Sequence, residues 1–239
     1  MTHTYHSGPH SREVWSAVAD TLRAIEELPF LAELAAGTLD ARAFTNYILQ
    51  DEIYLVGYAK AMTILASRAP ATEQTRFWAE AAGLAVYEEQ QMHAQLLGAD
   101  RLGPHVDDLT GGTGVPTASP TTLGYTSYLV AQAATAPYEV GVAAVLPCFW
   151  VYAHMGKVLT AAVGDRMADH PYREWIETYD SPEFDAAVDG AVAIYEGLAE
   201  EAGPAVRSAM VEAFRQATVY ECRFWDSAHV IEGWDASQT

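Results

Sequence analysis

The segment Ala144–Lys157 of this chain reads AVLPCFWVYAHMGK and is mostly apolar. Its apolar residues continue at helical spacing, which predicts one long apolar helix through the segment. Pro147 is costly in such a helix, because proline removes a backbone N–H donor and crowds the carbonyl group four residues earlier. Cys148, one of only two cysteines in the chain, follows directly. The segment is therefore a candidate functional site as well as a core helix.

Most of the remaining sequence shows the same helical spacing, and alternating runs bounded by hairpin turns are missing, which predicts an all-α fold. The expected helices cover residues 11–28, 39–68, 72–100, 121–136, 138–163, 170–179, 181–202 and 204–231. The irregular stretch 103–120 has two interpretations, a linker between domains or a surface loop within one domain. We favour the loop, which predicts a single helical domain over residues 1–239, with residues 1–10 as a flexible tail.

Composition disfavours several classes of function. The 239 residues are 50% hydrophobic, enough for a sizeable core, and carry a formal net charge of −19. A field of this sign repels phosphate backbones and anionic lipid headgroups, which disfavours nucleic-acid and membrane partners. The first residues lack a signal-peptide pattern, and no apolar run approaches the roughly 18 to 20 residues of a membrane span. A cytoplasmic chain with reduced thiols is expected.

One polar constellation lies in the segment NYILQDEIYLVGYAK, residues 46–60. Tyr47, Asp51, Tyr54 and Tyr58 are spaced four, three and four residues apart. They share one helical stripe roughly 60° wide. Either Asp51 faces solvent between amphipathic tyrosines, or it lies in an aromatic pocket suited to a flat heterocycle. A pocket carboxylate would add a charge-assisted hydrogen bond to such a ligand.

A second constellation surrounds Glu221 in the segment EAFRQATVYECRFWDSAH, residues 212–229. Its neighbours on the same helical face are apolar or aromatic, apart from one threonine. A carboxyl group on such a face is expected to be desolvated, which raises its pKa and makes it a candidate proton donor. The alternative is a buried glutamate satisfied by another helix.

The face around Cys148 is small and apolar except for Tyr152. A lone cysteine on such a face is more often inert packing than a nucleophile. Pro147 favours the nucleophile, because a kink at the proline would expose the thiol. Metal ligation finds little support, since Glu89 and His93 are only an approximate match to the Glu-x-x-His pairs of di-iron bundles. No metal and no cofactor are expected.

Together these segments resemble the TenA family, the thiaminase II enzymes with a haem-oxygenase-like helical bundle. The resemblance runs from about Glu27 to Trp234. It rests on the ordered motifs QD-x-x-YL, YTSYL, LPCFW-x-Y, W-I-x-x-Y and YE-x-x-FW. One departure is Leu28, where the family usually has the histidine of HPF.

The resemblance implies a role for each motif. It makes Cys148 the nucleophile and Glu221 the residue that hydrogen-bonds the pyrimidine and transfers protons. It makes Asp51 the carboxylate that binds the aminopyrimidine ring. The remaining matched residues are pocket tyrosines, namely Tyr54, Tyr125, Tyr152 and Tyr179.

The implied activity is hydrolysis of 4-amino-5-aminomethyl-2-methylpyrimidine to the hydroxymethylpyrimidine in thiamin salvage, with slower cleavage of thiamin. The resemblance also implies a homotetramer without a metal. Two other interpretations rank lower: an oxidase on the same helical scaffold, and a regulatory or binding protein. The net charge of −19 and the missing basic surface argue against a DNA-binding regulator.

Overall fold

The computed structural model describes residues 5, 8–97 and 102–234, without the side chains of residues 87–96. The described residues form eleven α-helices and one 3-10 helix. They are α1 (Pro9–Ser16), α2 (Ala19–Glu26), α3 (Pro29–Ala36), α4 (Ala41–Arg68), α5 (Thr72–Leu97), α6 (Gly103–Leu109), α7 (Pro120–Thr135), α8 (Tyr138–Val163), η1 (Gly164–Asp169), α9 (Arg173–Tyr179), α10 (Pro182–Glu201) and α11 (Pro204–Val230). The prediction of an all-α fold is confirmed.

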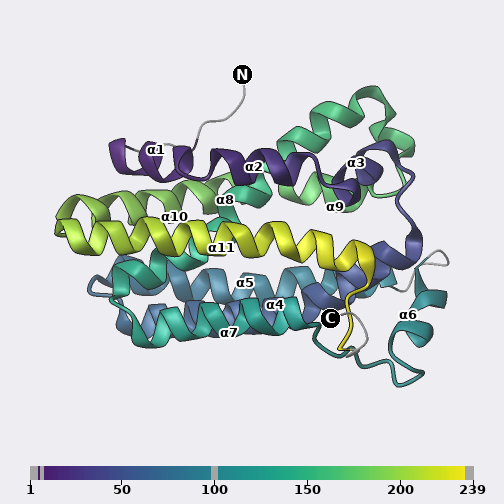
Figure 1. The fold of residues 1–239 in the computed structure, drawn as a ribbon, viewed down its shortest axis with the longest axis horizontal. Helices are drawn as coiled ribbons and strands as arrows, with labels where there is room; N and C mark the ends of the chain where they lie inside the picture. The colour runs from purple at the N-terminus through teal and green to yellow at the C-terminus, as the bar shows by residue number, and fades with distance from the viewer. Residues whose placement is uncertain (1–4, 6–7, 98–101, 235–239) are drawn as a thin grey trace.

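The long helices form a bundle with α8 at its centre (Figure 1). Helix α8 packs against α11, α10, α7 and α9, and α4 packs against α5, α7 and α11. The short helices α1 and α2 run along the opposite side of α11 from α4, α5 and α7 (Figure 1). The long helices of this bundle are thus held in place by contacts with several neighbours each.

Several helix ends follow directly from the sequence. Ser119 and Ser181 cap α7 and α10 by accepting hydrogen bonds from the backbone N–H groups of Thr122 and Phe184. A proline follows each of these caps, where its missing N–H donor costs nothing. Gly37 ends α3 with a φ of 73°, a left-handed conformation that favours glycine.

The predicted set of helices differs from the structure at several short elements. The expected helix 11–28 is two helices, and its start at Pro9 places Pro9 and His10 of the expected tail in α1. Helix α3 was missed, although Pro29 and Gly37 mark its two ends. Helix α6 was also missed inside the expected loop 103–120. These helices have only seven or eight residues, too few for a clear periodic pattern.

The expectation that no segment is apolar enough for a membrane span was wrong, because one segment has the length and the hydropathy of such a span. The stretch Tyr138–Asp169 reaches a mean hydropathy of 1.4 over an 18-residue window and is long enough to span. Within the protein, however, 78% of that window is buried. The apolar character of α8 is thus explained by its place at the centre of the bundle.

Candidate active site

A cavity of about 580 Å³ lies between α4, α5, α8 and the junction of α9 with α10. This is the usual size of a site for a small organic ligand. Five of the residues predicted from the sequence line it: Asp51, Tyr54, Cys148, Tyr152 and Tyr179. The structure therefore brings residues from three separate motifs to one place.

Helix α4 supplies a carboxylate and two phenols to the cavity. Asp51 is 2% exposed, so the interpretation of Asp51 as a solvent-facing residue was wrong. Tyr54 and Tyr58 lie one turn apart on the same wall, with stacked rings whose centroids are 5.6 Å apart. The hydroxyl group of Tyr58 donates to the backbone carbonyl of Val145 at 3.0 Å, which ties α4 to α8 one turn before Cys148.

Helix α8 supplies Cys148 and, one turn later, Tyr152. The helix continues through Pro147, and Cys148 is half-buried at the cavity surface. Burial raises the pKa of Tyr58 well above its usual range, and the nearby Cys148 raises it further. Tyr58 is therefore un-ionised beside the Cys148 sulfur atom. The two cysteines are not joined in a disulfide.

Glu221 and Tyr125 form a buried pair next to this wall. Tyr125 donates to Glu221 Oε1 at 2.6 Å, and its ring lies 4.9 Å from that of Tyr54. Burial raises the pKa of Glu221 to about 8, partly offset by the hydrogen bond from Tyr125 and reinforced by the negative charge of Asp51. The carboxyl group is therefore protonated at neutral pH.

One oxygen of this carboxyl group has no partner. Glu221 Oε2 is buried and accepts or donates no hydrogen bond within the described part of the chain. A buried polar atom without a partner is unusual and calls for an explanation, such as a ligand that completes it. Glu221 and Tyr125 are not among the residues that line the cavity, but they adjoin it: the ring of Tyr125 contacts that of the lining residue Tyr54, and the charge of the lining residue Asp51 acts on Glu221.

The outer wall of the cavity comes from Tyr179 and the start of α10. The ring of Tyr179 lies 4.9 Å from that of Tyr152 and 5.2 Å from that of Phe184. Tyr152 is held in turn by its hydroxyl contact with Tyr47 at 3.2 Å. Tyr47 thus supports the site from behind rather than lining it.

Helices α5 and α10 contribute side chains to this cavity that were not predicted from the sequence. Phe77 and Leu84 of α5 and Phe184 of α10 form much of the apolar lining, and Glu80 and Glu183 add two carboxylates. They fall on ordinary amphipathic faces, so no signal in the sequence marked them as functional. The stretch 103–120 contributes no lining residue.

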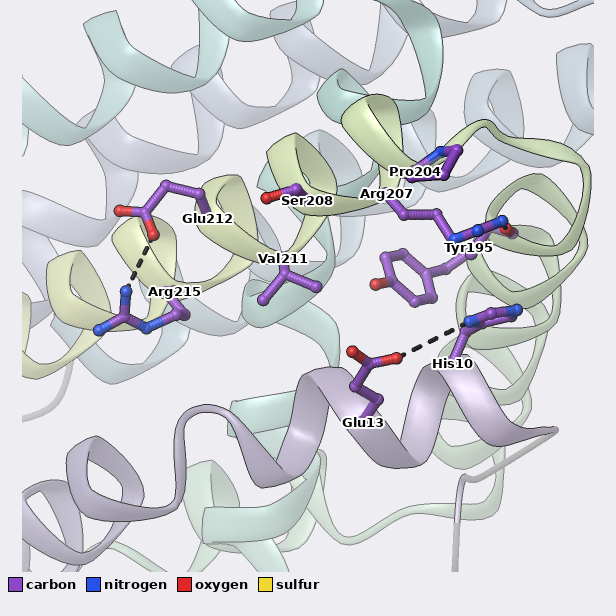
Figure 2. Close-up of a pocket in the computed structure, with 10 residues that line it drawn as sticks. His10, Glu13, Tyr195, Pro204, Arg207, Ser208, Val211, Glu212 and Arg215 are labelled. Atoms are coloured by element: carbon purple, nitrogen blue, oxygen red, sulfur yellow. Dashed lines mark hydrogen bonds and ion pairs between the residues drawn. The ribbon is translucent and has the colours of Figure 1, made fainter.

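A second cavity of about 510 Å³ lies between α1, α10 and α11 (Figure 2). Two side-chain pairs line it: Arg215 contacts Glu212 at 2.9 Å, and His10 contacts Glu13 at 3.9 Å. None of the residues predicted to be functional lines it. The first cavity is therefore the candidate active site.

The described side chains contain no group of three or more His, Cys, Asp and Glu residues arranged to hold a metal ion. The side chains of Glu89 and His93, the approximate match to a di-iron motif, lie outside the described part of the structure.

A sequence model of the TENA/THI-4/PQQC family matches residues 16–230. The chain belongs to this family. A relative from Bacillus subtilis, named aminopyrimidine aminohydrolase, is 31% identical over 95% of this chain and 92% of its own length. The thiamine biosynthesis multifunctional protein ThiED of Corynebacterium efficiens is 34% identical over 96% of this chain. The present chain spans only 29% of the length of that relative.

Solved structures of similar proteins agree with the fold. A TenA homologue from P. horikoshii OT3 matches with a TM-score of 0.76 and 25% identity, over 92% of this chain and 98% of its own. A domain with a heme oxygenase-like fold from Shewanella denitrificans matches with a TM-score of 0.69 and 14% identity, over 93% of this chain and 92% of its own. The predicted haem-oxygenase-like bundle is thus confirmed for this member of the TENA/THI-4/PQQC family.

Proposed function

We propose that this chain is an aminopyrimidine aminohydrolase of the thiaminase II type. The observation that supports this proposal most strongly is that Cys148, Asp51 and Tyr54 line one cavity, and that a protonated Glu221 lies next to it. The name of the Bacillus subtilis relative supports the same activity. The substrate is 4-amino-5-aminomethyl-2-methylpyrimidine, and thiamin is cleaved more slowly.

The proposed reaction uses Cys148 as a nucleophile. Asp51 accepts a hydrogen bond from the aminopyrimidine, and Glu221 donates a proton to the ring, which makes the ring electrophilic. The Cys148 sulfur adds to the ring, and the thiol proton passes to the amine, which leaves the exocyclic methylene group as ammonia. Water then adds to that methylene carbon and the carbon–sulfur bond breaks; a water proton returns to the Cys148 sulfur, and the ring proton returns to Glu221. The products are the hydroxymethylpyrimidine and ammonia.

The cavity walls suit the proposed substrate. Tyr54 and Tyr58 present aromatic surfaces to a flat ring, and ring stacking contributes about 0.5–1.5 kcal/mol beyond simple burial. The carboxylates Glu80 and Glu183 suit a leaving group that carries positive charge.

The decisive experiment is incubation of the protein with the aminomethylpyrimidine and, separately, with thiamin, followed by quantification of the hydroxymethylpyrimidine. We expect turnover of both, and faster turnover of the aminomethylpyrimidine. No release of hydroxymethylpyrimidine from either compound would contradict the proposed function.

Replacement of the nucleophile gives a sharper test. We expect Cys148→Ser to abolish hydrolysis, because a serine hydroxyl without an adjacent base is a weak nucleophile. The fold should be retained, which circular dichroism and thermal unfolding will check. Cys222→Ser is the matched control, since Cys222 is not among the lining residues of the cavity. Full activity of Cys148→Ser would rule out covalent catalysis by this thiol.

A further inference from the structure

An ion cluster lies behind the outer wall of the cavity. The Lys157 ammonium contacts Asp180 at 3.1 Å and Asp185 at 2.9 Å. The three side chains are 17%, 26% and 21% exposed, so water screens the cluster only partly. None of the three residues lines the cavity.

The two aspartates bracket the turn that forms the outer wall. Asp180 directly follows Tyr179, the last residue of α9, and Asp185 directly follows Phe184 in the first turn of α10. Tyr179 and Phe184 both line the cavity and contact each other. A single cation on α8 therefore holds both ends of this wall segment.

The backbone of α8 supports the same turn. A Cβ atom at Gly156 would lie only 2.5 Å from the carbonyl oxygen of Tyr179, so α8 and the end of α9 are in direct backbone contact. Lys157 directly follows Gly156, and its ammonium group contacts both aspartates beside this backbone contact.

Tyr5 covers the cluster from the N-terminal side. Its hydroxyl group donates to Asp185, and the Lys157 ammonium lies 5.8 Å from the centre of its ring. Tyr5 itself is only 5% exposed. An aromatic cover of this kind excludes water and strengthens the ion pairs beneath it.

We propose that Lys157 is a positioning residue that clamps the turn between α9 and α10, so that Tyr179 and Phe184 form a closed outer wall for the substrate. The proposal rests on the proposed function. Lys157 acts through the two aspartates and touches no reacting atom. Without it, Asp180 and Asp185 repel each other, and the wall segment moves away from α8.

The wall affects substrate binding more than chemistry, because Cys148 and Asp51 lie on α8 and α4. For Lys157→Met we expect the KM for the aminomethylpyrimidine to rise about tenfold, while kcat changes less than about twofold. Lys60→Met is the matched control, since Lys60 is the only other lysine and is exposed on α4. We expect Lys157→Arg to restore the KM to within about threefold of the wild-type value, because arginine can bind both carboxylates.

Hydrogen exchange tests the clamp without relying on activity. We expect faster exchange in residues 179–187 of Lys157→Met, and an unchanged rate there in Lys60→Met. An unchanged KM, or a loss confined to kcat, would overturn the proposal. If the wild-type protein hydrolyses neither substrate, the proposed function fails and the exchange rates alone decide whether the clamp exists. If Lys157→Met does not fold, Asp180→Asn is judged by the same criteria.

Discussion

At the scale of single residues, Glu221 links proton binding to folding. Its carboxyl group is 1% exposed, and one oxygen is occupied by Tyr125. The charged form is therefore disfavoured by burial, and the group holds its proton to about pH 8 in the folded protein, against a usual pKa of 4.5. The unfolded chain releases that proton at lower pH.

This difference in pKa predicts how the stability of Glu221→Gln, relative to wild type, changes with pH. Between about pH 4.5 and pH 8 the folded state binds more protons at this site, so the contribution of Glu221 to wild-type stability falls as the pH rises. The slope is on the order of 1.4 kcal/mol per pH unit. Glutamine carries no titratable proton, so the stability of Glu221→Gln relative to wild type should increase from pH 5 to pH 8. Urea unfolding of both proteins at these two pH values measures the change.

The same variant tests proton transfer. We expect Glu221→Gln to lower kcat by at least about a hundredfold, within the range for loss of a general acid. Asp107→Asn, which neutralises an exposed carboxylate after the first turn of α6, is the control and should retain wild-type kcat. Equal losses in the two variants would contradict the catalytic role of Glu221.

At the scale of helices, the packing of α8 against the end of α9 depends on Gly156. Alanine at this position would bring its Cβ atom to 2.5 Å from the Tyr179 carbonyl oxygen, and that backbone atom cannot move aside easily. We expect Gly156→Ala to reduce the free energy of unfolding by about 1–3 kcal/mol, the usual cost of overpacking.

Gly197→Ala is the matched control, because Gly197 lies inside α10 with nothing within 4 Å of an added Cβ atom. Replacement there should stabilise the helix by about 0.5–1 kcal/mol. Urea unfolding of both variants gives the comparison, and a neutral Gly156→Ala would show that the contact is looser than described.

The long helices could be predicted closely from the sequence, and the short ones could not. Helices α4, α8 and α11 have 28, 26 and 27 residues, which gives their periodic patterns many repeats. The break between α1 and α2 carries no proline or glycine, and it reflects packing against different partners, α10 for α1 and α11 for α2. Such a tertiary cause is invisible in local sequence.

At the scale of the whole molecule, charge is the dominant feature. A net charge of −19 attracts cations to the surface, and the carboxylates Glu80 and Glu183 extend that field to the cavity. We expect the KM for thiamin, whose thiazolium ring is a permanent cation, to rise with salt between about 0.01 and 0.15 M ionic strength, as the Debye length shortens from about 30 to 8 Å. Steady-state kinetics in sodium chloride measures the effect.

Binding of the neutral hydroxymethylpyrimidine serves as the reference, since it should change little over the same salt range. A KM for thiamin that is insensitive to salt would contradict electrostatic attraction of the substrate. The homotetramer remains a prediction from the family resemblance, and the cytoplasmic location remains a prediction from the sequence.

Only those parts of the site that lie in recognisable sequence motifs could be predicted. Motifs on α4, α8 and α9 marked five lining residues, because aromatic and ionisable groups stood out on otherwise apolar faces. The contributions of α5 and α10, such as Phe77 and Phe184, depend on how the helices cross in space. The angle at which two helices cross depends on how their side-chain surfaces pack together, and this cannot be read from a single sequence.

The tryptophans near the cavity give the protein an intrinsic fluorescence signal close to the site. The rings of Trp225 and Trp175 lie 4.8 Å from Tyr152 and 4.9 Å from Tyr179, respectively. Both indoles are almost completely buried, yet each is separated from the cavity by a single phenol. A ligand that displaces water from the cavity changes the polarity felt by these fluorophores. Intrinsic emission can therefore report occupancy of the site for molecules that the protein binds and does not convert.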